Sequence, residues 1–140
     1  MKVLFVNHRQ SACGVYEFGR NIGAALGKKP QNFVYRECAS SDELHSILKQ
    51  DQFDAIIYNH HAATLPWLTA EVTRKIKAPQ IGIIHEVTQA VADKADNSLF
   101  NFHIAHDPTL LLKNPIVFKA GRLVPRYENK FQAPATPPMP

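Results

Sequence analysis

Six short runs of apolar and β-branched residues, separated by stretches with helical spacing, constrain this fold more than any other feature of the sequence. The runs are residues 3–6, 33–35, 55–58, 81–84, 102–105 and 116–118. Continuous runs of this length are typical of strands that are buried on both faces. The intervening stretches predict helices over residues 16–26, from 41 onward, and over 65–77, 87–95 and 108–113.

This alternation predicts a parallel sheet. Strands that are joined through helices run in the same direction, and right-handed crossovers place helices on both faces. We therefore expect an α/β fold, a doubly wound, mainly parallel, Rossmann-like sheet of about six strands in the order 3-2-1-4-5-6. Residues 1–128 form this domain, and the proline-rich segment 129–140 reads as an extended linker or tail, which suggests that a further domain follows.

Composition narrows the class of protein. No apolar run approaches the roughly 20 residues that span a bilayer, and the first run is too short for a signal peptide, so we expect a cytoplasmic protein. Cys13 and Cys38 are then reduced thiols. The net charge of +4 predicts only a weak attraction to phosphates or anionic membranes. A basic stripe interleaved with aromatic residues is missing, which argues against nucleic-acid binding.

Polar residues gather where the predicted strands end. The carboxyl ends of parallel strands meet at one edge, and ligands bind there, near the point where the strand order reverses. The residues expected to bind a sugar or acceptor at this edge are His8, Asn59, His60, His61 and His106. Neutral imidazoles bond hydroxyl and phosphate oxygens without carrying charge, so a polyhydroxylated ligand suits them. Alternatively, each histidine only caps a helix or ends a strand.

A metal site is a sharper alternative that the spacing does not favour. His60 and His61 are adjacent on a strand and point to opposite faces, and the known zinc spacings are missing. We predict no metal and no cofactor. The glycines after the first strand, at positions 14, 19 and 23, also miss the dinucleotide fingerprint. Gly19 and Gly23 are four residues apart on a helix, which indicates close packing.

Several segments together resemble the N-terminal domain of GT-B glycosyltransferases of the family-four type. They are the opening residues 2–8, the loop Cys13-Gly14-Val15, the helix end at 22–26, the segment 81–86 and the closing residues 123–126. In that family a Gly-Gly-Val loop precedes the first helix, and the fourth strand ends in a histidine followed by an acid. The resemblance spans essentially the whole chain but only half of the family's two-domain architecture.

The resemblance implies roles for individual residues. The phosphates of a nucleotide-sugar donor would lie at Cys13, Gly14 and Val15, with Cys13 standing where the family has its first glycine. His85 and Glu86 would form the catalytic pair, with His85 contacting the transferred sugar and Glu86 holding the edge. The donor is bound mainly by the family's C-terminal domain, so the isolated chain is expected to be inactive toward its unknown acceptor.

Two other functions remain open from the residues. The incomplete site also fits a non-catalytic Rossmann-like binding or interaction module. A small nucleotide-dependent enzyme that uses Gly14 and Glu37 is the remaining alternative, since Glu37 follows the second predicted strand.

Overall fold

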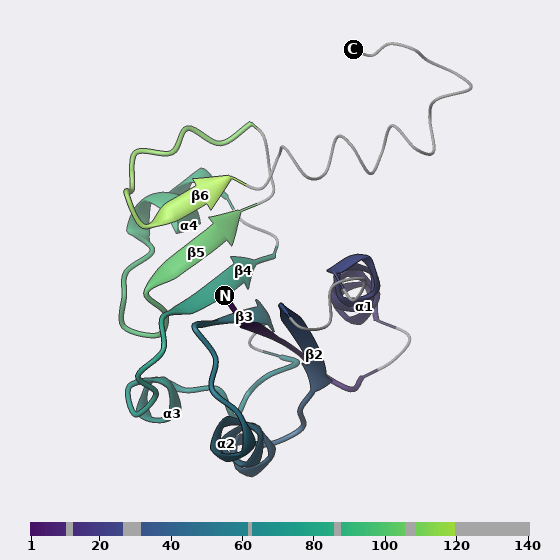
Figure 1. Ribbon diagram of the computed structural model, residues 1–140. Coiled ribbons are helices and arrows are strands. Elements are labelled where there is room, and N and C mark those ends of the chain that lie inside the picture. Colours follow the sequence, from purple (N-terminus) through teal and green to yellow (C-terminus); the bar gives the residue numbers. More distant parts are fainter. Residues whose placement is uncertain (11–12, 27–31, 62, 86–87, 106–108, 120–140) are drawn as a thin grey trace, which may run out of the picture.

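Six parallel strands form the centre of the computed structural model, which describes residues 1–10, 13–26, 32–61, 63–85, 88–105 and 109–119 (Figure 1). The strands are β1 (Val3–Asn7), β2 (Phe33–Glu37), β3 (Ala55–His60), β4 (Gln80–Ile84), β5 (Phe102–Ala105) and β6 (Val117–Lys119). Every neighbouring pair is parallel. The predicted α/β class and the doubly wound, parallel sheet are therefore confirmed.

The strand order is β2-β1-β3-β4-β5-β6, so the predicted order 3-2-1-4-5-6 is wrong in its first half. β3 lies between β1 and β4, and β2 is the edge strand. Strand composition gives the physical reason: β2 ends in Arg36 and Glu37 and is only partly buried, whereas every residue of β1 is buried. The order of strands therefore reverses between β1 and β3, and their carboxyl ends meet at that point.

Four helices are described: α1 (Gly14–Leu26), α2 (Ser41–Gln50), α3 (Ala70–Thr73) and α4 (Gln89–Lys94). α2 begins where the sequence predicts it, because the Ser40 hydroxyl caps it by accepting from the Glu43 amide at 3.2 Å. α1 packs closely on the sheet. A Cβ on Gly19 would lie 2.4 Å from Asn59 Nδ2, and one on Gly23 would lie 2.3 Å from the Tyr35 ring. The predicted packing role of both glycines is confirmed.

Two predicted helices differ from the structure. The helix expected over 65–77 is reduced to α3, because residues 65–69 are not helical and the Leu68 amide bonds the Leu65 carbonyl in a turn at 3.1 Å. Residues 109–113 of the helix expected over 108–113 are not helical. Gln89 on α4 explains this, because its side chain bonds both the amide and the carbonyl of Leu111, at 2.9 and 2.7 Å.

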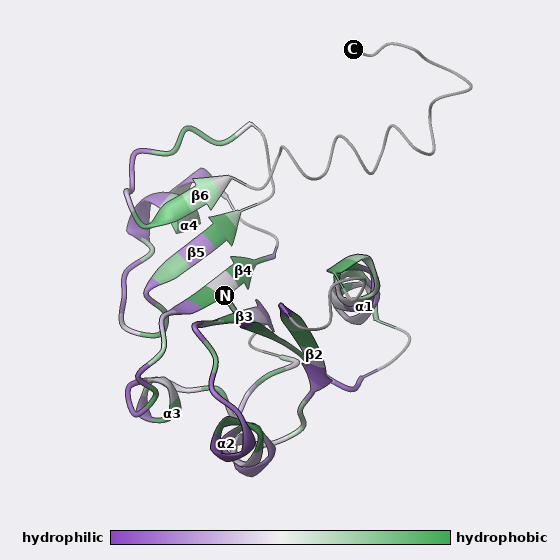
Figure 2. Ribbon diagram, in the orientation of Figure 1, coloured by the Kyte–Doolittle hydropathy of each residue, from purple (hydrophilic) through white to green (hydrophobic). Residues whose placement is uncertain are grey.

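Helices cover both faces of the sheet. Side chains of a strand alternate between faces, and Asn7, Tyr35 and Asn59 meet α1 on one of them. The opposite face carries the main core of Leu4, Val6, Ile56 and Tyr58 with α2 and the segment 65–76. A smaller core joins α4 to β5 and β6 on that same face, through Ala92, Ala105, Leu110 and Val117. In Figure 2, α2 carries hydrophobic residues on one side and hydrophilic residues on the other.

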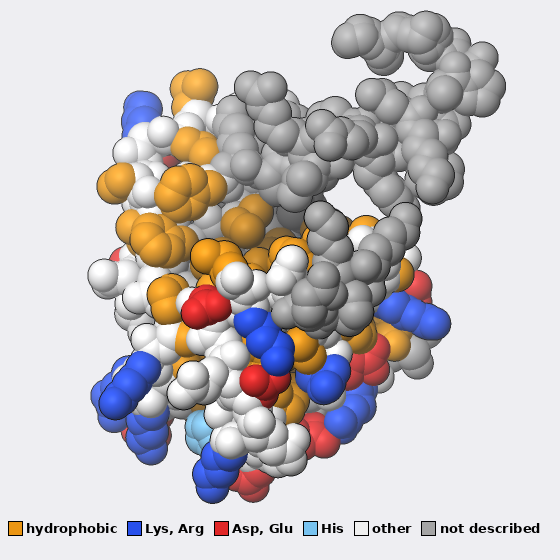
Figure 3. All heavy atoms as spheres, viewed as in Figure 1, with side chains coloured by type: hydrophobic (Ala, Val, Ile, Leu, Met, Phe, Trp, Pro, Cys, Tyr) orange, Lys and Arg blue, Asp and Glu red, His pale blue; other side chains and the backbone are white. Residues whose placement is uncertain are grey.

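The α1 face of the sheet is apolar beyond α1. Phe102 and Phe118 are 39% and 51% exposed, with ring centroids 5.7 Å apart, and Figure 3 shows hydrophobic side chains gathered over this part of the molecule. No helix among the described residues covers them. Within the same described part, no helix is long and apolar enough to cross a membrane. The tail 129–140 lies outside the described residues.

Candidate functional site

The carboxyl edge of β1, β3 and β4 gathers most of the predicted site residues. His8 follows β1, Asn59 and His60 end β3, His61 follows it, and His85 follows β4. The first turn of α1 lies over the same edge, because Asn59 on β3 bonds its backbone. Glu86 and His106 lie outside the described residues.

Asn59 connects the start of α1 to His85. It is fully buried, and its Nδ2 donates to Asn7 Oδ1 at 2.9 Å and to the Val15 carbonyl at 2.6 Å. Its Oδ1 lies 2.6 Å from Nε2 of His85. Both amide hydrogens of Asn59 are used on oxygen acceptors, so its oxygen faces His85 and the imidazole donates from Nε2. His85 therefore carries a hydrogen on Nε2.

Asn7 extends this network towards β2. Its Nδ2 donates to the Tyr16 carbonyl at 3.1 Å and to the Tyr35 hydroxyl at 2.9 Å, while its Oδ1 also accepts from the His8 amide at 2.9 Å. The Tyr35 and Tyr16 hydroxyls both donate to Oε2 of Glu37, at 2.7 and 2.9 Å. Burial raises the pKa of Tyr35 far above its usual value, so this hydroxyl keeps the proton that it donates.

The predicted phosphate loop presents an open backbone. Gly14 begins α1, a helix of 13 residues, and is exposed, with nothing within 4 Å of the position of an added Cβ. The first amides of a helix have no partner within the helix, and its dipole favours negative charge there. Cys13 is a half-buried free thiol whose carbonyl accepts from the Glu17 amide at 3.0 Å. Val15, the third residue of this loop, is the one whose carbonyl accepts from Asn59 at the edge.

His8 lies beneath this loop and is 1% exposed. Its Nδ1 accepts from the Gln10 amide at 2.9 Å, so Nε2 carries the hydrogen of the neutral ring. That Nε2 has no hydrogen-bond partner in the described part of the chain. Burial lowers the pKa of His8, with a smaller opposing effect of Glu37, and its ring packs edge-on against Tyr16. His8 is thus a buried donor rather than a solvent-facing ligand of the edge.

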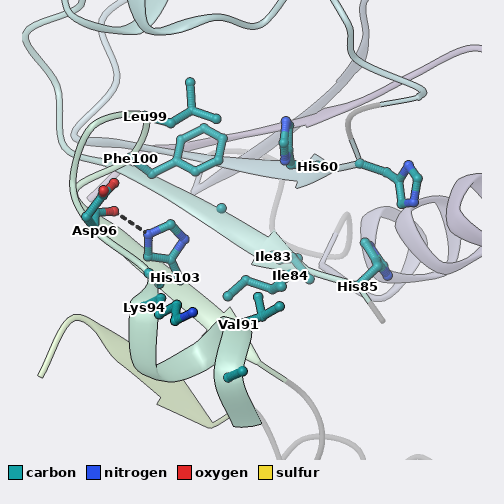
Figure 4. A pocket seen from close by; sticks show the side chains of 14 residues that line it. His60, Ile83, Ile84, His85, Val91, Lys94, Asp96, Leu99, Phe100 and His103 are labelled. Carbon is teal, nitrogen blue, oxygen red and sulfur yellow. Dashed lines mark hydrogen bonds between the residues drawn. The ribbon is translucent and has the colours of Figure 1, made fainter. Parts of the chain in front are cut away.

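A pocket of about 650 Å³ opens beside His85 on the α2 face of the sheet (Figure 4). Three predicted residues, His60, His61 and His85, line it. The sequence analysis did not place any other lining residue in a site; the polar and aromatic ones among them are Lys94, Asp96, Phe100 and His103. Phe100 precedes β5 and His103 lies within it. The pairing of β4 with β5 sets His103 beside Gly82, and the sequence alone does not reveal that pairing.

His60 is a lining residue of this pocket whose pKa is shifted by burial. Burial, with smaller effects of His61 and His103, lowers the pKa of His60 to about 4. Its ring meets the edge of Phe100, with centroids 5.2 Å apart. His103 donates from Nε2 to the Asp96 carbonyl at 2.9 Å. His60 is therefore neutral at pH 7 and offers one donor and one acceptor.

Within the described residues, no group of three or more histidine, cysteine or acidic side chains is arranged to hold a metal ion. Comparisons of the chain with protein-family models, with curated proteins and with solved structures give no match. The function is therefore argued from the geometry of this edge.

Proposed function

We propose that the carboxyl edge of the sheet binds a nucleotide-sugar and that this chain is the acceptor-side domain of a glycosyltransferase. A further donor-binding domain completes the enzyme. The observation that carries the proposal is the hydrogen-bonded chain from the Val15 carbonyl through Asn59 to His85. It ties the helix start that suits phosphates to the imidazole that suits a sugar.

The two ends of this hydrogen-bonded series, the start of α1 and His85, suit different parts of a nucleotide-sugar. The start of α1, with the open backbone at Gly14, favours the negative charge of a diphosphate. His85 meets the sugar, and Asn59 fixes its ring orientation before the ligand binds, which lowers the entropy cost of a productive geometry. The hydrogen bond from Nε2 to Asn59 Oδ1 thus sets the direction in which the ring meets the ligand.

The proposed reaction is a simple group transfer. A bond forms between the hydroxyl oxygen of the acceptor and the anomeric carbon of the donor sugar. The bond between that carbon and the phosphate oxygen breaks, and its electron pair leaves with the nucleoside diphosphate. The hydroxyl proton passes to solvent or to the released phosphate. The products are the glycosylated acceptor, the nucleoside diphosphate and a proton.

The geometry does not support the small nucleotide-dependent enzyme. A dinucleotide site at this place needs the acid after the second strand to bind a ribose hydroxyl. Glu37 Oε2 instead accepts from the Tyr16 and Tyr35 hydroxyls, which fastens β2 to α1. Glu37 therefore has a structural role.

Calorimetric titration of the 140-residue chain with UDP-glucose and with GDP-mannose tests the proposal. We expect weak, saturable binding of at least one of them, reduced by about ten-fold or more in His85→Ala. His45→Ala is the matched control, because His45 lies on α2, away from the edge, and its affinity should equal that of the parent. Circular dichroism checks that both variants fold. A parent that binds neither compound at millimolar concentration, but binds a protein partner stoichiometrically, would instead favour the interaction module.

A further inference from the structure

The pocket beside His85 differs in character from the phosphate end of the same edge. Eight of its 14 lining residues are apolar or glycine: Gly82, Ile83, Ile84, Ala90, Val91, Ala95, Leu99 and Phe100. Among the lining residues that the structure describes, Lys94 and Asp96 are the ones with a formal charge, and they offset each other. Asp96 Oδ1 is moreover occupied by the amide and the hydroxyl of Ser98, at 3.0 and 2.6 Å. The lining thus offers an apolar wall without net charge.

Three rings form one side of this pocket. The ring of Phe100 lies edge-on to His60 at 5.2 Å and to His103 at 5.9 Å, with interplanar angles of 77° and 73°. Gly82 makes room for this arrangement, since a Cβ there would lie 2.3 Å from the Phe100 ring. Figure 4 shows Phe100 and His60 on one side, with Val91 and Lys94 across from them. A flat ligand ring between the walls would meet these rings in the offset-stacked or edge-to-face arrangements that aromatic pairs prefer.

The polar groups of the pocket suit a hydroxyl. Neutral imidazole both donates and accepts, as a hydroxyl does, and His60 stays neutral over the physiological range. A phosphate or carboxylate would lose its hydration and meet a single exposed cation, Lys94, with Asp96 beside it. The volume of about 650 Å³ lies in the range of small-molecule sites.

We propose that this pocket binds an uncharged alcohol with a flat apolar ring, and that such alcohols are the acceptors of the transfer. The acceptor role rests on the proposed function, whereas binding in the pocket does not. His85 lines the pocket and also belongs to the Asn59 network, so the pocket adjoins the proposed sugar position. One edge then holds the charged donor at α1 and the neutral acceptor at α4.

The test is a nuclear magnetic resonance titration of the full chain with three naphthalenes that differ in charge. They are 2-naphthol, 2-naphthoate and 2-naphthylmethylamine at pH 7, followed through the ring signals of His60, Phe100 and His103. We expect saturable shifts with 2-naphthol. The anion and the cation should each bind at least about ten-fold more weakly. Binding that is tightest for either ion, or no saturable shift with 2-naphthol, would overturn the proposal.

Two variants locate the binding. Val91→Trp adds bulk at the rim, where Val91 is 47% exposed, and should lower the affinity for 2-naphthol by about ten-fold without disturbing the core. Leu111→Trp is the matched control, because Leu111 is 67% exposed and does not line the pocket. Gly82→Ala displaces Phe100 and should also weaken binding. Unchanged affinity in Val91→Trp would contradict the pocket assignment even if Gly82→Ala fails to fold.

A parallel titration with UDP-glucose separates the two proposals. If 2-naphthol binds and no nucleotide-sugar does, the pocket stands and the acceptor role falls with the proposed function. If UDP-glucose shifts the Gly14 and Val15 amides while 2-naphthol leaves all three rings unchanged, the donor site stands and the ring-alcohol pocket is refuted.

Discussion

At the residue scale, His60 lines the pocket and also links stability to pH. The neighbouring strands and the Phe100 ring exclude water from the His60 side chain. The charged form of the imidazole is therefore disfavoured, and the pKa of His60 falls to about 4. In an unfolded chain the same side chain has a pKa near 6.5. Between these values the unfolded state binds a proton that the folded state does not.

This difference predicts that stability falls as the pH drops from 7 to 5. We expect His60→Gln to lose less unfolding free energy over this range than the parent, by roughly 1 to 2 kcal/mol, since part of the ring still meets solvent. Urea unfolding at the two pH values measures it. Identical pH dependence in His60→Gln and the parent would show that His60 is not buried as described.

Asn59 is the residue on which the candidate site depends most. We predict that Asn59→Asp lowers the free energy of unfolding by roughly 3 kcal/mol, because it removes both donors and places a carboxylate against the Asn7 and Val15 oxygens. Asn21→Asp is the control on the exposed side of α1 and should change stability by less than about 0.5 kcal/mol. Urea unfolding at pH 7 compares them, and equal stabilities would contradict the network.

Individual site residues were predictable from the sequence only in part. Position after a buried strand brought Asn59, His60, His61 and His85 to the correct edge, because strand ends follow from apolar runs. The sequence predicted His8 at the same edge, but not its almost complete burial, which involves contacts with the Tyr16 ring and the Gln10 amide. The hydrogen-bond partners of Asn59 could not be predicted from the sequence, because the pairing of β1 with β3 sets Asn7 beside Asn59.

At the scale of elements, α1 is positioned by two residues without side chains, Gly19 and Gly23. Gly19 and Gly23 let the helix backbone approach Asn7, Asn59 and Tyr35, and the helix start then lies at the carboxyl edge. The spacing of the glycines alone indicated this packing. The side chains that fill the space did not follow from sequence, since they come from three different strands.

Alanine at these glycines tests the close approach. Gly19→Ala should lower the free energy of unfolding by roughly 1 to 3 kcal/mol, because the new Cβ overlaps Asn59 Nδ2 and this exceeds the gain in helix propensity. Gly14→Ala is the matched control at the start of the same helix, with open space around its Cβ, and should be nearly neutral. Thermal unfolding that ranks Gly19→Ala at or above the parent would contradict the packing of α1.

Individual hydrogen bonds, which the periodic pattern does not reveal, explain the helices that differ from prediction. The apolar spacing over 65–77 was real, since Leu65, Leu68, Val72 and Ile76 do pack on the core. Turns rather than one helix deliver them there. Near Leu111 a single glutamine side chain replaces helical bonding, and such long-range partners leave no trace in periodicity.

At the scale of the whole molecule, fold class followed from the alternation of runs, whereas strand order did not. The predicted and the observed order both allow right-handed connections, so the difference lies in burial: β3 is more buried than β2, and β2 takes the edge. The observed order places the reversal between β1 and β3. It thereby sets Asn7 beside Asn59 and, through His85, connects the start of α1 with the pocket beside α4.

The central claim is that the start of α1 and His85 form one ligand site at this edge. Amide chemical-shift mapping of the ¹⁵N-labelled chain during titration with UDP-glucose or GDP-mannose tests it most directly. The account predicts that one of them shifts the signals of Gly14, Val15, Asn59 and His85 together, with a common saturation curve. Shifts that cluster elsewhere, or no shift with either compound at millimolar concentration, would contradict it.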